Sequence, residues 1–83
     1  MSGPAVTLDC RGMACPRPII ELARRIGEIE IGAELELLAD DPAAHADLIA
    51  WCRMRGHTLV VADPPRFVVR RVGPPTTRAA AAG

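Results

Sequence analysis

The sequence contains no lysine and no tyrosine, and its 83 residues include one phenylalanine and one tryptophan. Without a lysine ε-amine, the chain cannot hold pyridoxal phosphate as the usual Schiff base. The shortage of aromatic rings disfavours stacking against nucleic-acid bases. Ten arginines balance ten acidic side chains, so the formal net charge is zero. A protein that binds nucleic acid directly would need a basic excess, and we expect no such binding here.

Long apolar runs are also lacking. No stretch approaches the ~20 apolar residues that a membrane-spanning helix needs, and residues 1–4 do not begin a signal peptide. We therefore expect a cytoplasmic protein without a membrane anchor. Thiols stay reduced in the cytoplasm, and three cysteines are an odd number for a disulfide framework. Each cysteine should be either a small buried side chain or a reagent.

The apolar patterns predict one domain over residues 1–72, with the element order βαβαββ. Strands are expected near residues 5–8, 34–39, 58–62 and 67–72, and helices from Pro16 and from Asp41 onward. Residues 10–14 should form a loop with Gly12 as its turn residue. This order predicts an α/β (α+β) two-layer sandwich, with two helices on one face of a four-stranded mixed sheet. The helical crossovers favour parallel neighbours, and the last two strands should form an antiparallel hairpin. Residues 73–83 offer little to bury, and we expect a disordered tail.

The first predicted helix has apolar residues at helical spacing on one side and charged residues on the other. Glu21 with Arg25, and Arg24 with Glu28, stand at the i,i+4 spacing of helical ion pairs. Proline is favoured at the first helical position, so Pro16 predicts Cys15 as the N-cap. The predicted apolar stripe comprises Ile19, Leu22, Ala23 and Ile26, and Ile29 continues the same spacing.

The second predicted helix explains several polar residues without assigning them chemistry. Asp41 followed by Pro42 predicts an N-cap and a first helical position, and Gly56 predicts the end of the helix. Cys52 lies on the apolar stripe and should be a core residue. His45 should be solvated in the first turn, and His57 should bond a backbone group.

Cys15 carries the chemistry that the sequence predicts. Partial positive charge at a helix N-terminus favours thiolate over thiol, and Arg11 and Arg17 are close enough in sequence to add to this effect. Pro16 and Pro18 remove two amide donors from the first turn, so we expect moderate activation. The prolines also stiffen the turn and should leave the sulfur exposed. Such a thiol suits attack on a sulfane sulfur or a disulfide.

The segment Leu8-Asp9-Cys10-Arg11-Gly12-Met13-Ala14-Cys15-Pro16-Arg17-Pro18 resembles the N-terminal signature of the TusA (SirA-like, YeeD-like) sulfur-carrier family. That signature is Leu-Asp, a glycine, and then Cys-Pro-x-Pro at the head of a helix. The later Ala39-Asp40-Asp41-Pro42-Ala43 resembles the family motif before the second helix. The match covers roughly residues 6–72.

The resemblance implies that Cys15 carries sulfur as a transient persulfide and that Asp9, Gly12, Pro16 and Pro18 support its loop. The implied donor is a cysteine desulfurase or a rhodanese-like protein, and the implied acceptor is a DsrE/TusD-like or other protein. Acceptors in this family serve tRNA thiolation, molybdenum-cofactor assembly or sulfur oxidation. No bound cofactor is implied. The cysteine and histidine spacing matches no standard zinc pattern, so no metal is expected. We expect a monomer with transient heteromeric contacts.

Two other functions fit the same residues. Cys10 lies five residues before Cys15 and could form a dithiol redox pair with it, or it could simply pack at a strand end. The chain could also be a noncatalytic regulatory adaptor. For docking on partners, the candidates are the arginines of the first helix and the acidic pair before the second: Arg17, Arg24, Arg25, Asp40 and Asp41.

Overall fold

The computed structural model describes residues 3–14 and 16–72 of the 83-residue chain. The expected tail, residues 73–83, lies outside the described residues, as does Cys15. The elements follow in the order β1 (Val6–Asp9), α1 (Arg17–Arg25), the 3₁₀ helix η1 (Ile26–Glu28), β2 (Glu34–Leu38), α2 (Ala44–Arg55), β3 (Thr58–Asp63) and β4 (Arg66–Arg70).

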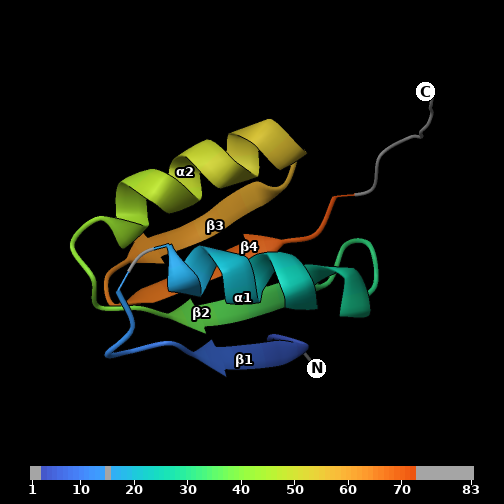
Figure 1. The fold of residues 1–83 in the computed structure, drawn as a ribbon. Coiled ribbons are helices and arrows are strands. Elements are labelled where there is room, and N and C mark those ends of the chain that lie inside the picture. Colours follow the sequence, from blue (N-terminus) through green and yellow to red (C-terminus); the bar gives the residue numbers. More distant parts are fainter. Residues whose placement is uncertain (1–2, 15, 73–83) are drawn as a thin grey trace.

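Both helices lie on one face of a four-stranded mixed sheet, as the sequence predicted (Figure 1). The strand order is β1-β2-β4-β3, with β1 and β2 parallel and the other two pairs antiparallel. One expectation was wrong: β3 does not pair with β2, although a helical crossover joins them. The β3–β4 hairpin folds back so that β4 inserts between β2 and β3, and antiparallel pairing on both sides of β4 satisfies its backbone groups.

The core forms between the helices and the sheet because strand side chains alternate between the two faces. On β2, Leu35 and Leu37 are fully buried, while the alternate residues Glu34, Glu36 and Leu38 are half-buried. Helices α1 and α2 contribute Leu22 and Leu48, both with no exposed surface. Each such side chain stabilises the fold by about 1.5–3 kcal/mol.

The predicted apolar stripe of α1 is correct except at one position. Leu22 and Ile26 are buried and Ile19 is half-buried, but Ala23 is exposed. Ile20, which was not assigned to the stripe, is half exposed. The buried residues Pro18, Leu22 and Ile26 stand four residues apart, so only a narrow line along the helix faces the core and Ala23 lies beside it. Gly56 ends α2 with a left-handed φ of 79°, as predicted.

Candidate functional site

Three connecting segments meet at one end of the sheet (Figure 1). They are the loop that follows β1, the loop that follows β2, and the turn at Pro64 and Pro65 that joins β3 to β4. Because β1 and β2 are parallel, their carboxyl ends lie at the same edge, where the fold brings loop residues from distant parts of the chain together. We call this region the carboxyl edge.

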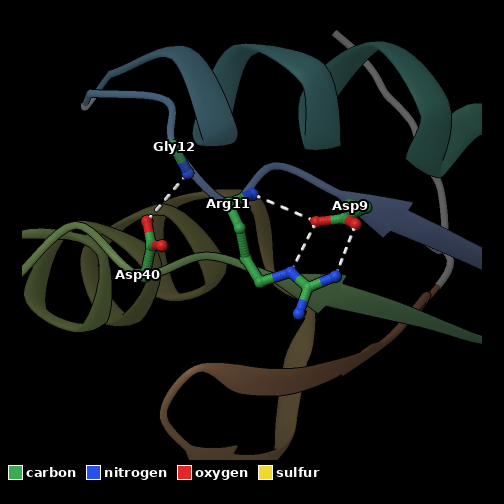
Figure 2. Close-up of polar contacts among 4 residues, drawn as sticks. All are labelled: Asp9, Arg11, Gly12 and Asp40. Atoms are coloured by element: carbon green, nitrogen blue, oxygen red, sulfur yellow. Dashed lines mark hydrogen bonds and ion pairs between the residues drawn. The ribbon is translucent and has the colours of Figure 1, made fainter.

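Asp9 and Arg11 lock the first half of the β1–α1 loop. The Asp9 carboxylate accepts hydrogen bonds from the Arg11 backbone N–H at 3.2 Å, from Nε at 2.9 Å and from Nη2 at 2.7 Å (Figure 2). The Arg11 side-chain bonds, followed by its backbone bond, lower the pKa of Asp9 to about 2. The Asp9 carboxylate therefore neutralises the Arg11 charge. Arg11 stabilises a nearby thiolate less than the sequence suggested.

Gly12 and Asp40 tie the two loops of the carboxyl edge together. Gly12 has a φ of +85°, which favours glycine, and its N–H donates to Asp40 Oδ1 at 2.9 Å (Figure 2). The sequence predicted Gly12 as a turn residue, and this is confirmed. It proposed Asp40 as a partner-docking residue. The structure adds that Asp40 fixes the loop that leads to Cys15.

Cys15 itself lies outside the described residues, but both of its neighbours are described. Ala14 and Pro16 are exposed, and the Arg17 N–H donates to the Ala14 carbonyl at 3.0 Å. Helix α1 begins one residue later than predicted: Pro16 stands at the N-cap and Pro18 at the second helical position. Pro18 is fully buried, so it anchors the first turn to the core while Pro16 faces solvent.

The other two thiols belong to the core. Cys10 and Cys52 are each 3% exposed and lie in the main hydrophobic cluster. Burial raises the pKa of Cys10, and the charges of Glu21 and Asp9 raise it further. Burial alone raises the pKa of Cys52 to about 11. Both thiols stay protonated near neutral pH, which makes them poor nucleophiles.

The arginines proposed for docking differ in how their charges are used. Arg24 pairs with Glu21 at 3.6 Å, and Arg25 pairs with Glu28 at 2.7 Å. The i,i+4 pairs predicted from the sequence are therefore wrong, and both observed pairs have i,i+3 spacing. The Arg25–Glu28 pair spans η1, where side chains three residues apart eclipse. Glu21 and Arg24 both lie in α1, where residues three apart are also neighbours on the helix surface. Arg17 is exposed, and no ion pair involves it within the described parts of the chain.

Asp41 shapes the start of α2, although the regular helix begins later than predicted. Its Oδ1 accepts the Ala43 N–H at 2.8 Å, and its carbonyl accepts the Ala44 N–H at 3.0 Å. The α-helix starts at Ala44 with Ala43 as its N-cap, because Pro42 and Ala43 form a turn first. The Asp41 side chain thus caps this entry turn, as the sequence proposed for the helix itself.

A cleft of about 440 Å³ opens at the carboxyl edge beside Asp40. We call it the edge cleft. Its apolar lining residues include Pro42, Pro64, Pro65 and Phe67, and Asp40, Asp41 and His45 line it as well. The His45 ring lies against Phe67, with 5.7 Å between ring centroids. His45 was expected to be simply solvated, so the structure corrects that expectation.

A family model described as "Sulfurtransferase TusA" matches residues 6–71, which include every element of the fold. The chain belongs to the TusA sulfurtransferase family. A crystal structure of a SirA-like protein from Desulfitobacterium hafniense has a similar fold, with a TM-score of 0.60 and 24% sequence identity. The likeness covers 77% of this chain and 90% of that protein.

For this member of the TusA family, sequence reasoning missed the edge cleft and the bond between Gly12 and Asp40. A signal for the bond was present: Asp40 and the loop that contains Gly12 each follow a strand, and the predicted parallel pairing places both at one edge. The cleft depends on β4 lying next to β2, which the sequence did not predict. In the described residues, no group of three or more histidine, cysteine or acidic side chains could hold a metal ion. No helix of the described chain is long and apolar enough to cross a membrane.

Proposed function

We propose that Cys15 accepts a sulfane sulfur as a persulfide and hands it to an acceptor protein. The observation that carries this proposal is the match to the sulfurtransferase family over residues 6–71, a stretch that contains Cys15 and its Cys-Pro-x-Pro motif. The Cys15 thiolate attacks the outer sulfur of a donor persulfide, a new S–S bond forms, and the donor leaves as a thiolate that takes up a proton. Transfer to the acceptor repeats the exchange in the other direction.

The surroundings of Cys15 support a reactive thiol at this position. Ala14 and Pro16 are exposed, and the preceding loop is fixed by the Asp9–Arg11 and Gly12–Asp40 contacts. A fixed loop presents a nucleophile at a low entropic cost. Arg17 supplies a nearby positive charge that favours the thiolate.

The donor in this proposal is a cysteine desulfurase or a rhodanese-like protein, and the acceptor is a DsrE/TusD-like or other protein of the reducing cytoplasm. Docking uses Arg17, Arg24 and Arg25 on one side of the loop and Asp40 and Asp41 on the other. Because Arg24 and Arg25 already pair with glutamates, a partner must compete for them, and Arg17 contributes most of the free positive charge near Cys15. The acceptor's pathway, whether tRNA thiolation, molybdenum-cofactor assembly or sulfur oxidation, decides which partner docks.

The burial of Cys10 argues against a dithiol redox protein. A buried thiol with a raised pKa forms a disulfide slowly, because the thiolate is the attacking species. The carrier proposal therefore expects Cys10→Ser to load sulfur as the wild type does, within the limits of any loss of stability. The redox alternative expects that variant to be inactive.

The test is peptide mass spectrometry after the reduced protein meets inorganic polysulfide or a persulfidated rhodanese. Wild type, Cys10→Ser, Cys15→Ser and Cys52→Ser are compared, with and without a reductant. We expect a gain of one sulfur atom on the peptide that contains Cys15, reversed by the reductant and lost only in Cys15→Ser. An unmodified Cys15 with both donors, or a Cys10–Cys15 disulfide as the sole product, would refute the carrier function.

A further inference from the structure

The two edges of the sheet differ in how they are protected against further strand pairing. Strands β1 and β3 stand at the ends of the strand order, so each has one side to which no described strand is bonded (Figure 1). β1 has four residues and β3 has six. Native edge strands are usually kept short or carry proline or charged side chains, which prevents another strand from pairing with them. β1 is protected by its length, whereas β3 is long enough to pair with another strand.

The sequence of β3 offers little of this protection. The run Thr58-Leu59-Val60-Val61-Ala62 contains no charge and no proline, and its valines and threonine favour strands. Val60 is 39% exposed. Ala62 pairs with the core residue Phe67 and so faces the helices, yet it is exposed. Helix α2 therefore leaves this part of the β3 edge uncovered, and the backbone N–H and C=O groups of the edge can bond a further strand.

A bulge in β3 sets which residues face each side of the sheet. The pairing with β4 passes from Leu59 directly to Val61, so Val60 has no partner of its own. Apart from Val60, the residues of β3 alternate regularly between the two faces. Leu59 and Ala62 face the helices, because they pair with buried core residues of β4. The helix-free face carries Thr58, Val61 and Asp63.

This pattern of faces is the same in both directions about Val61. When two strands pair antiparallel, residues directly opposite each other lie on the same face. With Val61 opposite Val61 of a second copy, that condition holds along the whole strand. Leu59 then lies opposite Ala62, and Thr58 lies opposite Asp63. The bulge thus brings the full length of β3 into register with itself.

The charges at the two ends of β3 also complement each other. Asp63 at one end and Arg55, which precedes the other end, are both exposed, and neither takes part in an ion pair within the described chain. At about 3.3 Å per residue the two ends lie roughly 17 Å apart, which exceeds the Debye length of about 8 Å at physiological salt. The two charges therefore do not neutralise each other within one chain. An antiparallel second copy brings each Asp63 to the end that carries Arg55, whereas a parallel copy would bring like charges together.

We propose that β3 pairs antiparallel with β3 of a second copy of this chain, with a two-fold axis at Val61, so that two four-stranded sheets become one. The interface is isologous, and both copies keep their helices on the same side of the joined sheet. A single pair of six-residue strands buries less than the roughly 1,600 Å² of a standard interface, so the dimer is weak. The monomer that the sequence predicted is then the form at low concentration. The loop that leads to Cys15 follows β1 at the opposite edge of the sheet, so dimerisation leaves sulfur loading unaffected.

Sedimentation equilibrium of the full chain tests the dimer, from micromolar to millimolar concentration and with a reductant present. The reductant excludes dimers that are linked through a disulfide between two Cys15 residues. We expect a reversible monomer–dimer equilibrium without larger species, because the pairing closes on itself. Amide hydrogen exchange within residues 58–63 should slow as the dimer forms, while exchange in β1 should not change.

A matched pair of variants locates the contact. Val61→Lys places two like charges opposite each other at the two-fold axis, and it should weaken the dimer by about tenfold or more. Thr7→Lys adds the same charge to the helix-free face at the other edge, where Thr7 is exposed and pairs with Glu36. We expect Thr7→Lys to leave dimerisation unchanged.

Charge reversal tests the direction of pairing at two exposed positions. Asp63→Lys and Arg55→Glu should each weaken the dimer several-fold, and the double variant should recover most of the loss. Such a recovery reports a contact between copies, because the two residues are too far apart to interact within one chain. Since Val61 is half-buried, these variants also keep the test intact if Val61→Lys does not fold.

A chain that stays monomeric at millimolar concentration would overturn the proposal. It would also be overturned if Thr7→Lys weakened association as much as the β3 variants, or if the double charge reversal recovered nothing. Association that continues to larger polymers would show that β3 pairs with another surface, such as the β1 edge of the next copy, and not with itself.

Discussion

The carboxyl edge and the helix-free face of the sheet are both exposed and charged, but they use their charges differently. On the helix-free face, Glu36 accepts from Thr7 and pairs with Arg66 across the strands, and Glu34 pairs with Arg70 at 3.0 Å. Those side chains bond mainly to one another. At the carboxyl edge, three carboxylates accept backbone N–H groups: Asp9 from Arg11, Asp40 from Gly12, and Asp41 from Ala43.

This difference separates a solvated face from a site. Paired charges on the helix-free face stabilise a fold that would form without them, because exposed ion pairs contribute little. Carboxylates that bind backbone N–H groups at the carboxyl edge decide the shape of two loops, and one of these leads to Cys15. The comparison shows that the role of a charged side chain is better judged from the group it binds than from the side chain's exposure to solvent. Four predictions, each made with substituted variants, test this comparison.

The largest effect is expected where the carboxyl edge meets the core. Phe67→Ala removes a fully buried ring that also forms a wall of the edge cleft, and it should cost about 3–5 kcal/mol of unfolding free energy. Its neighbour Val68 is 3% exposed but lies outside the main core cluster, since it pairs with Glu36 and belongs to the other face. Val68→Ala should cost about 2 kcal/mol. Urea denaturation measures both, and equal losses would contradict this division of the sheet.

A smaller effect is expected from the backbone of the loop. Gly12→Ala places a side chain at a φ of +85°, which costs about 1–2 kcal/mol for a residue other than glycine. The loop should respond by weakening the Gly12–Asp40 bond, which faster hydrogen exchange at residue 12 would report. The matched control is Gly27→Ala, whose φ is not positive and whose added methyl group meets no atom within 4 Å. A loss of stability in the control as large as in Gly12→Ala would remove the argument from φ.

The sequence predicted features that arise between residues close together in the chain better than those that join distant segments. Strands, helices, the Gly12 turn and the Gly56 helix end follow from local patterns, and the structure confirms them. The antiparallel β3–β4 hairpin was predicted and is confirmed, but the insertion of β4 between β2 and β3 was not predicted, because it depends on packing across the whole sheet. The ion pairs of α1 were assigned to the wrong partners, because residues three and four apart are both neighbours on a helix surface and the sequence does not decide between them. The role of Cys15 rests on its motif, and it stays a prediction.

A pH-dependent effect is expected at the opposite end of the sheet, where His57 Nδ1 accepts the Val72 N–H at 3.1 Å. Burial, followed by the charges of Arg71 and Arg55, lowers the pKa of His57 below 6.5, so the folded state favours the neutral ring. Its contribution to stability is present above pH 6.5 and is lost as pH falls through the lowered pKa. Asp9, with a pKa of about 2, stays charged over this range. The denaturant midpoint at pH 8 and the midpoint at pH 5 should therefore differ less in His57→Gln than in wild type. If the two proteins show the same difference between pH 8 and pH 5, groups other than His57 cause the pH dependence.

The smallest effect is expected on the helix-free face. Arg70→Gln removes the partner of Glu34, and an exposed pair of this kind contributes about 0.2–1 kcal/mol. The small loss should vanish in 1 M salt, and sulfur loading on Cys15 should match wild type. Denaturation at two salt concentrations and the loading assay measure both quantities. A clear fall in loading would show that the helix-free face takes part in the site.

The central claim is that Cys15 carries sulfur between proteins, and isotope transfer tests it most directly. The protein is loaded with ³⁴S at its sulfane position, separated from the donor, and mixed with a reduced rhodanese as a model acceptor. Mass spectrometry then follows the label on the Cys15 peptide and on the active-site cysteine of the rhodanese. The account predicts that ³⁴S leaves Cys15 and appears on that cysteine in equal amount. Label that never occupies Cys15, or that leaves it only as free sulfide, would contradict the account.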